Sequence, residues 1–214
     1  MSRQLPQFAR RMVIPLILVV LLAACGQAND EPVPAEAAEA LGDVLSAAEL
    51  VGTNWRAVAF GTPGNSKPVD EATNLTLSIG VERYAGSGGC NWFLGVYAVE
   101  GEQIAFRSPA ETAQLCTDPS GIMEQEATYL SALQNLVEYR QLDEKLLGYT
   151  SGNQLLLTFV PADPVAFEGT AWSLMFLEEN EAAAPVIMGT SITVTFASGR
   201  LSGSAGCNTY EAAY

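Results

Sequence analysis

An internal repeat is the feature of this chain that most constrains its fold. The glycine-rich segment 86–91 (GSGGCN), followed by Tyr97, returns 117 residues later as segment 203–208 (GSAGCN), followed by Tyr214. One register that holds over about 45 positions indicates a duplicated structural unit. We therefore expect one complete unit and the first part of a second, which stops where the first still has about 65 residues to run. The paired positions are Trp55 with Trp172, Gly86 with Gly203, Gly89 with Gly206, Cys90 with Cys207, Asn91 with Asn208, and Tyr97 with Tyr214.

The first 24 residues read as an export signal. Arg3, Arg10 and Arg11 precede an apolar run of 13 residues (12–24), which is too short to cross a bilayer comfortably. Small residues lead directly into Cys25, a pattern that resembles the lipobox of bacterial lipoproteins. In such proteins the signal peptide is cut before the cysteine, which then carries the lipid. We therefore expect an extracytoplasmic protein anchored to a bacterial membrane through Cys25. The alternative is an ordinary secretory signal with an incidental cysteine.

The charge of the remaining chain limits its partners. Removal of the signal leaves 24 acidic and seven basic residues, a net charge near −17. This charge disfavours nucleic-acid partners and electrostatic binding to anionic headgroups, so the lipid is expected to provide the membrane attachment. Residues 25–49 hold six acidic and no basic residues and few large apolar side chains, which predicts a flexible tether. Solubility is the simplest account of the acidity.

Residues 50–162, the first complete unit, read as short strands around one helix. Leu75, Leu77 and Ile79 alternate with polar residues, as in a half-buried strand. Turn residues at 100–102 and 151–153 predict two hairpins. Residues 50–60 are expected to form the first strand and Gly61–Pro68 a loop.

The helix is predicted to begin near Asp118, which would cap it, with Pro119 at its first position. Glu124 and Glu126 are expected to face solvent. The predicted buried stripe comprises Met123, Ala127, Leu130, Leu133 and Val137. We therefore predict an α+β unit, a strongly curved antiparallel sheet or open barrel covered by one amphipathic helix. Residues 163–214 are expected to form a partial second copy.

Several motifs of the first unit together resemble the META domain family, which includes a heat-shock lipoprotein. They are Trp55 after Gly-Thr, the GSGGCN segment with Tyr97 behind it, the segment Thr112–Cys116 (TAQLC), and Met123–Glu126 with Tyr129, Leu130 and Leu133. The resemblance covers roughly residues 50–160 and again 167–214. It implies a small β-rich domain with a helix, in envelope proteins linked to stress or antibiotic tolerance, and it establishes no catalytic residue. Trp92 and Thr209 stand where the family often has arginine after Gly-Cys-Asn.

Cys90 and Cys116 are candidates for a disulfide, because both lie in one unit of a protein that we expect to be exported. The bond would close a loop of 26 residues and stabilise the fold by roughly 3–4 kcal/mol in the chain-entropy model. Two buried free thiols are the alternative. Cys207 matches Cys90, but its expected partner would lie beyond Tyr214, so we expect it to be unpaired.

The residue types argue against catalysis. The chain contains no histidine, which excludes histidine-based triads, Cys-His dyads and histidine metal sites. Ser87 and Ser204 lack the spacing of a nucleophile elbow, and the glycine segment lacks the Lys-Ser/Thr pair of a phosphate loop. The glycines are expected to permit a bulge or a close approach of two strands. Asn91 is expected to bond to neighbouring backbone, with a polar anchor for a ligand as the alternative. No cofactor or metal is expected.

We therefore expect a non-catalytic envelope lipoprotein with META-like domains and a binding or structural role in envelope stress or antibiotic tolerance. One alternative is a carrier or chaperone of a small apolar ligand such as a lipid. The aromatic residues that would line its pocket are Trp55, Trp92, Phe93, Tyr97 and Tyr149. Another alternative is an enzyme inhibitor that engages a protease through an exposed loop such as Gly61–Pro68.

Overall fold

The computed structural model of the protein describes residues 45–179 and 182–214. The predicted signal peptide, Cys25 and most of the predicted tether lie outside the described residues. The elements of the first unit are α2 (Ala47–Leu50), β1 (Asn54–Thr62), β2 (Asn65–Pro68), β3 (Thr76–Ile79), β4 (Arg83–Ser87), β5 (Trp92–Glu100), β6 (Gln103–Glu111), α3 (Ile122–Gln134), β7 (Glu138–Leu142), β8 (Lys145–Tyr149) and β9 (Leu155–Pro161). Over the described part of the chain, no helix is long and apolar enough to span a membrane.

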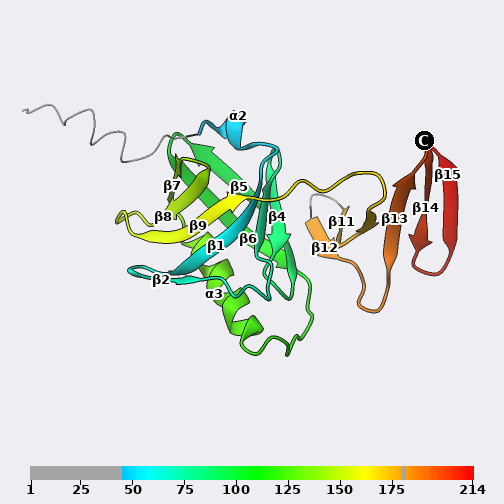
Figure 1. Ribbon diagram of the computed structural model, residues 1–214, viewed down its shortest axis with the longest axis horizontal. Helices are drawn as coiled ribbons and strands as arrows, with labels where there is room; N and C mark the ends of the chain where they lie inside the picture. Colours follow the sequence, from blue (N-terminus) through cyan, green and yellow to red (C-terminus); the bar gives the residue numbers. More distant parts are fainter. Residues whose placement is uncertain (1–44, 180–181) are drawn as a thin grey trace, which may run out of the picture. The chain divides into compact units, whose positions relative to one another are not determined.

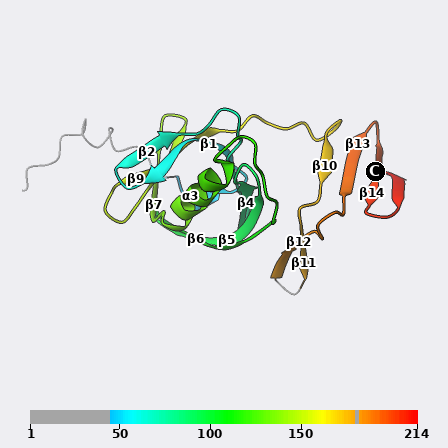
Figure 2. The ribbon, with the colours of Figure 1, turned by 90° about the horizontal axis from the view of Figure 1, so that it is seen from below.

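The strands of the first unit form one antiparallel sheet that curves into a ring. The strand order is β2-β1-β3-β4-β5-β6-β7-β8-β9, and β1 also pairs with β9, which closes the ring. β6 and β7 pair at one position, Gln103 with Glu138. α3 contacts β1, β6 and β9 and lies at one end of the ring (Figures 1 and 2). The predicted α+β architecture, a strongly curved antiparallel sheet covered by one helix, is confirmed.

Alternating side chains and glycine turns explain most of these strands. In β3, Leu77 and Ile79 are buried while Thr76 and Ser78 are half-buried, as the two faces of a strand require. The β5–β6 hairpin turns between Glu100 and Gln103, where Gly101 adopts φ +60°. Both predicted hairpins are present.

The start of the unit differs from the sequence expectation. Residues 47–50 form a short helix, β1 begins at Asn54, and the predicted loop 61–68 continues β1 and returns as β2. A capping box between Ser46 and Glu49 starts the short helix. Leu50 at its end is buried in the core, and the Tyr139 hydroxyl donates a hydrogen bond to the carbonyl of Leu45. The segment 45–50, expected as the end of the tether and the start of a strand, therefore packs against the ring.

The helix α3 begins later than predicted, and its buried stripe matches the predicted one only in part. Gly121, with φ +88°, occupies the N-cap position and supplies no side-chain cap, so Asp118 is not the cap. Ala127, predicted to be buried, is exposed, and Met123 is half-buried. The buried residues of the helix are Ile122, Glu126, Tyr129, Leu130, Ala132 and Leu133. Leu130 and Leu133 are buried as predicted. The prediction was wrong for Met123 and Ala127 because helical spacing fixes a period, whereas the neighbouring strands decide which side is covered.

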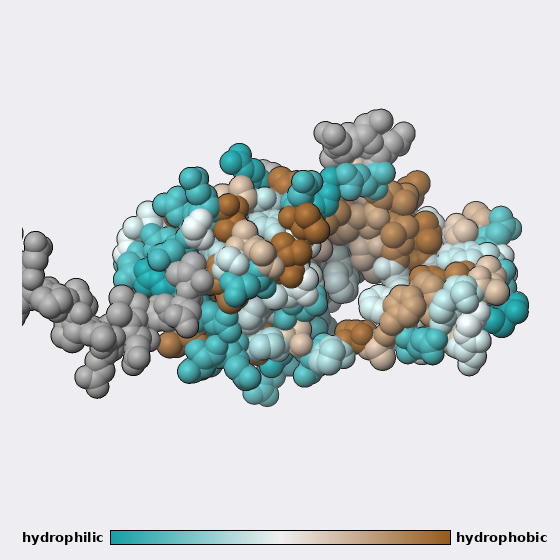
Figure 3. Space-filling view, turned by 90° about the horizontal axis from the view of Figure 1, so that it is seen from above, coloured by the Kyte–Doolittle hydropathy of each residue, from teal (hydrophilic) through white to brown (hydrophobic). Residues whose placement is uncertain are grey.

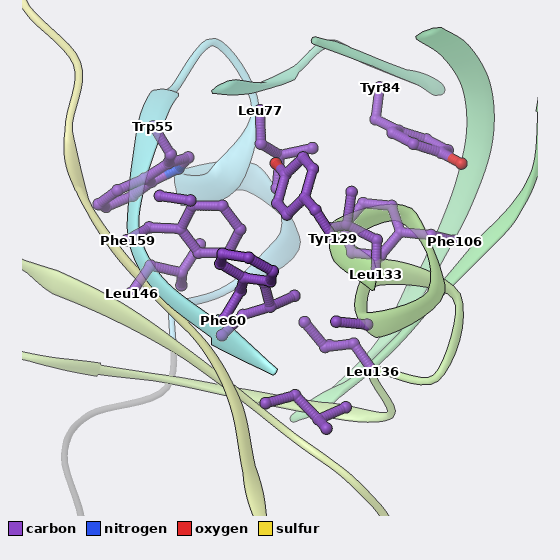
Figure 4. Close-up of a cluster of buried hydrophobic side chains, with 14 of the residues drawn as sticks. Trp55, Phe60, Leu77, Tyr84, Phe106, Tyr129, Leu133, Leu136, Leu146 and Phe159 are labelled. Atoms are coloured by element: carbon purple, nitrogen blue, oxygen red, sulfur yellow. The ribbon is translucent and has the colours of Figure 1, made fainter. Parts of the chain in front are cut away.

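The ring of Tyr129 occupies the centre of the core (Figure 4). It is fully buried, and the rings of Phe60, Phe93 and Phe159 lie with their centroids 6.5, 6.1 and 6.4 Å from it. Its hydroxyl donates a hydrogen bond of 3.0 Å to the carbonyl of Thr76. One helix side chain therefore contacts four strands of the ring, namely β1, β3, β5 and β9.

The interior of the ring is filled. A cavity of about 10 Å³ lies among apolar residues that include Leu77, Phe106, Leu136 and Phe159. That volume is close to the least that a single water molecule needs. Binding pockets for small organic ligands are tens of times larger.

The second unit repeats the strand pairing of the first. Its strands are β10 (Ala171–Ser173), β11 (Phe176–Glu179), β12 (Ala182–Pro185), β13 (Ile192–Ala197), β14 (Arg200–Ala205) and β15 (Thr209–Ala213). The order β10-β13-β14-β15 corresponds to β1-β3-β4-β5. Trp172 lies opposite Val194 as Trp55 lies opposite Leu77, and Gly203 opposite Tyr210 as Gly86 opposite Phe93. The 117-residue offset of the sequence is thus also the offset of the backbone register.

Equivalent positions of the two units differ in burial. Leu77 is 1% exposed, whereas Val194 at the matching position is half-buried. Around the β11–β12 hairpin, apolar side chains gather at the surface (Figure 3). The exposed ones in this part of the chain include Leu174, Leu177, Ile187 and Met188. In the described residues, the second sheet lacks the helix cover that α3 gives the first.

Replacement of Leu133 by alanine tests the core. Leu133 is 1% exposed, so Leu133→Ala leaves a cavity and should lower the free energy of unfolding by about 2–5 kcal/mol. Leu115, 90% exposed, is the matched control, and Leu115→Ala should change the free energy by less than about 0.5 kcal/mol. Denaturant unfolding followed by tryptophan fluorescence measures both. Equal effects of the two substitutions would contradict the described packing.

The buried tyrosines predict a loss of stability at high pH. Burial and, second, the negative charge of Glu111 raise the pKa of Tyr84 to about 12 from the ordinary 10.0, and burial raises the pKa of Tyr129 well above 10.0. The folded chain keeps protons that the unfolded chain loses, so this stabilisation is complete below pH 10 and falls as pH rises from about 10 through about 12. Denaturant unfolding at pH 8, 10, 11 and 12 should show the decline, and Tyr84→Phe should make it shallower. A free energy of unfolding that stays constant from pH 9 to pH 12 would refute the burial of these phenols.

Candidate functional site

Three segments of the first unit meet at the start of α3. The first is the glycine segment 86–91, which joins β4 to β5. The second is the segment 112–117 between β6 and α3, which has no helix, strand, turn or bend. The third is the first half of α3 itself. We call the polar contacts among them the Glu126 network, because its central group is the carboxylate of Glu126.

The carboxylate of Glu126 accepts three hydrogen bonds from the glycine segment. The backbone N–H groups of Cys90 and Asn91 donate to Oε2 at 3.2 and 2.5 Å, and the Asn91 amide nitrogen donates to Oε1 at 2.7 Å. Glu126 is 4% exposed and Asn91 5%. A buried carboxylate is tolerable when donors surround it in this way. The sequence expectation that Glu126 faces solvent is therefore wrong.

The side chain of Asn91 links the helix to the segment 112–117. Its amide nitrogen donates to Glu126 and, at 3.2 Å, to the carbonyl of Gln114. Its amide oxygen accepts from the Thr112 hydroxyl at 2.9 Å and from the Gln114 N–H at 2.7 Å. The two donors and two lone pairs of the amide are all used. Asn91 therefore bonds not to backbone next to it in the sequence, as expected, but to the backbone of Gln114 and the side chains of Thr112 and Glu126, which are far from it in the chain.

A disulfide between Cys90 and Cys116 adds a covalent link between the same segments. The sulfur atoms are 2.07 Å apart and the Cα atoms 5.8 Å, over a separation of 26 residues. The predicted disulfide is confirmed. It ties the residue before Asn91 to the end of the Thr112–Cys116 motif, so the covalent link and the Asn91 hydrogen bonds act on adjacent residues.

Glycine is required at two positions of the glycine segment for different reasons. A Cβ atom on Gly88 would lie 2.6 Å from Oε2 of Glu126, which is closer than atoms can approach. Gly89 adopts φ +106°, a conformation that is costly for other residues. The backbone of the segment therefore approaches the carboxylate as closely as the chain allows.

A second carboxyl group lies near Glu126. Partial burial and, second, the negative charge of Glu126 raise the pKa of Glu111. Every buried side-chain nitrogen or oxygen of the described residues has a hydrogen-bond partner. The polar groups of the Glu126 network are therefore used in holding its segments together.

The structure brings together most of the motif residues predicted for the first unit. Gly86, Gly89, Cys90, Asn91, Thr112 and Cys116 belong to the network or border it. Trp55 lies in the core instead, with its indole N–H donating to the Thr53 hydroxyl, and the Tyr97 hydroxyl donates to the carbonyl of Gly80. Sequence reasoning missed Glu126. The available signal was its position three and four residues before Tyr129 and Leu130, on the same helix face.

The matching residues of the second unit are more exposed. Gly203 and Gly206 keep their backbone roles, since a Cβ on Gly203 would meet the Thr193 carbonyl at 1.9 Å and Gly206 has φ +98°. Cys207 is free and exposed, as expected, and Asn208 is exposed. Trp172 is partly exposed, and Tyr214 bonds to Glu168. Within the described residues, the glycine turn is repeated and the acid that anchors it is not.

Removal of the Glu126 carboxylate should destabilise the unit. Glu126→Ala leaves three buried donors unsatisfied, which should lower the free energy of unfolding by about 3 kcal/mol or more. Glu124, two residues earlier and exposed, is the matched control, and Glu124→Ala should cost less than about 1 kcal/mol. Thermal and denaturant unfolding measure both. A small effect at Glu126 would show that the network does not hold the segments together.

The disulfide predicts the thiol pattern of the denatured chain. Without reductant, an alkylating reagent should label Cys207 and leave Cys90 and Cys116 unlabelled, as peptide mass spectrometry can read. Reduction should expose both and lower the free energy of unfolding by roughly 3–4 kcal/mol. Labelling of Cys90 before reduction would rule the bond out, and labelled Cys207 shows that the reagent worked.

The chain is similar to several known proteins and to one family model. Similar solved structures include an NMR structure of a protein from Burkholderia xenovorans (24% identity, TM-score 0.47, covering 57% of this chain and 92% of that one). They also include a crystal structure of a DUF4847 family protein from Bacteroides vulgatus (13% identity, TM-score 0.39, covering 52% and 93%). No curated protein matched the chain. The model of the META domain matches residues 48–164, more than half of the chain, so the protein belongs to the META domain family.

Proposed function

We propose that this protein is a non-catalytic envelope lipoprotein that acts by presenting a rigid surface to a binding partner. The observation that carries the proposal is the Glu126 network. Its buried carboxylate and amide are used in fixing the segment 112–117 at the surface. Buried polar groups that serve chemistry keep a donor or acceptor directed at a substrate. Here the bonds of Asn91 are directed at the backbone of Gln114 and at the side chains of Thr112 and Glu126.

The interior of the domain favours this function over transport of an apolar ligand. A carrier needs a cavity that encloses its ligand, typically of several hundred Å³. The ring of the first unit holds about 10 Å³ among its core side chains. A lipid inside it would require the displacement of packed aromatic residues such as Phe106 and Phe159. The surface of the domain is therefore the better candidate for recognition.

The proposed location rests on the sequence of the amino terminus. The basic head, the short apolar run and the small residues before Cys25 support export followed by lipid attachment. An anchored domain on a tether would act at a membrane surface outside the cytoplasm, where the disulfide is stable. A role in envelope stress or antibiotic tolerance fits that location.

Substitution of Cys25 tests the anchor. The unaltered chain should separate with the membranes, and Cys25→Ala should appear in the soluble extracytoplasmic fraction or keep its signal peptide. Cys207→Ala is the matched control, because Cys207 is a free cysteine in the folded part of the chain, and it should leave the distribution unchanged. Growth under envelope stress or antibiotics, with and without each variant, reads out the physiological role. An unchanged distribution of Cys25→Ala would exclude the lipid anchor.

A further inference from the structure

Leu115 is the most exposed of the large hydrophobic residues of the described chain. Its side chain is 90% exposed, compared with 80% for Ile187 and 79% for Val81. It lies in the middle of the segment 112–117, which runs without a turn or bend between β6 and α3. A leucine in this position contributes nothing to the core and costs solubility. Single exposed hydrophobic residues are common on protein surfaces. What distinguishes Leu115 is how firmly the backbone on either side of it is held.

The backbone on both sides of Leu115 is held. Before it, the N–H and carbonyl of Gln114 are both bonded to the Asn91 amide, at 2.7 and 3.2 Å. After it, Cys116 is bonded to Cys90 through the disulfide. Further back, the Thr112 N–H donates to the carbonyl of Trp92 at 3.0 Å. The segment, which runs without a turn or bend, therefore does not have to acquire its shape when a partner binds, and this removes an entropic cost of association.

The neighbours of Leu115 indicate what kind of partner fits. Ala113, Gln114 and Thr117 are exposed, uncharged and small or medium in size. The segment thus offers a run of backbone without a turn or bend that carries one large apolar side chain. The active-site cleft of a serine endopeptidase accepts a ligand of this form, since it binds extended chain and admits one side chain into its primary specificity (S1) pocket. Complexes of proteases with their inhibitors typically form between surfaces that are already in the bound shape.

We propose that the segment 112–117 is an inhibitory loop for a serine endopeptidase with an apolar S1 pocket, and that Leu115 fills that pocket. This inference rests on the proposed function, in that the domain acts by surface binding. It moves the inhibitor hypothesis away from Gly61–Pro68, which forms part of the β1–β2 hairpin, to a segment that is clamped on both sides.

The clamps explain why such a loop inhibits instead of being consumed. The protease serine oxygen adds to the Leu115 carbonyl carbon, the bond to the Cys116 nitrogen breaks, and the serine proton passes through the protease histidine to that nitrogen. The new Cys116 amine cannot diffuse away, because its disulfide to Cys90 keeps it in place. It can attack the ester, return the proton to the serine and restore the peptide bond. If water attacks the ester instead, the new carboxylate and amine remain on one folded domain.

A specificity switch at Leu115 tests the proposal. The full-length chain in mild detergent is assayed against chymotrypsin, whose S1 pocket is hydrophobic, and trypsin, whose S1 pocket holds an aspartate. The unaltered chain should inhibit chymotrypsin and not trypsin. Leu115→Lys should weaken chymotrypsin inhibition about 100-fold or more and create trypsin inhibition. Val81→Lys, at a similarly exposed position on another surface, should behave as the unaltered chain.

Each other outcome overturns the proposal. The proposal is overturned if the unaltered chain inhibits neither protease, or if mass spectrometry shows the Leu115–Cys116 bond cleaved at the rate of an ordinary substrate. It is also overturned if Leu115→Lys leaves the pattern of inhibition unchanged. The assay is performed in solution and does not depend on Cys25. A negative fractionation test therefore excludes the lipid anchor without affecting the inhibition proposal, and a negative inhibition test excludes the inhibitory loop without affecting the anchor.

Discussion

The carboxylate of Glu126 is the group on which the arrangement of the first unit depends. It lies in α3, and its three hydrogen bonds reach the glycine segment between β4 and β5. Because it is 4% exposed, its charge is stabilised chiefly by those donors. The glycine segment must come close enough to donate them, which excludes a side chain at Gly88. One buried charge thus sets the backbone of a loop, the identity of a glycine and the position of the helix.

Tyr129 and Glu126 make two different kinds of contact for the helix. Three residues apart on α3, they lie on one helix face. Tyr129 enters the aromatic core and joins β1, β5 and β9 through Phe60, Phe93 and Phe159. Glu126 instead accepts hydrogen bonds at the polar end of the ring, and Asn91 and the Cys90–Cys116 disulfide connect it to the segment 112–117. Apolar packing therefore positions the helix, and the polar network transmits that position to the surface around Leu115. A rigid surface loop follows from a well-packed interior.

The repeat shows how far sequence patterns can predict this protein. The strand alternation and the glycine turns correctly predict the curved sheet and its hairpins. The 117-residue offset correctly predicts the strand register that β10, β13, β14 and β15 share with the first unit. These features depend on residues close in sequence or on their period. In the first half of α3 the buried residues are Ile122 and Glu126, where Met123 and Ala127 were predicted, so Glu126 was placed on the wrong face. Both errors arise because helical spacing is the same whichever side is buried.

The sequence by itself determined the period of the strands and the turns at glycine, since these follow from local preference, and it identified Cys90 and Cys116 as candidates for a disulfide, which the structure shows to be formed. The tertiary structure decided which helix face is buried, that Glu126 is a buried anchor, and that Leu115 stands exposed between two held residues. The reason is physical. A carboxylate becomes an anchor only when distant backbone N–H groups surround it, and a leucine becomes a candidate contact only when its neighbours are fixed by residues far away in the chain.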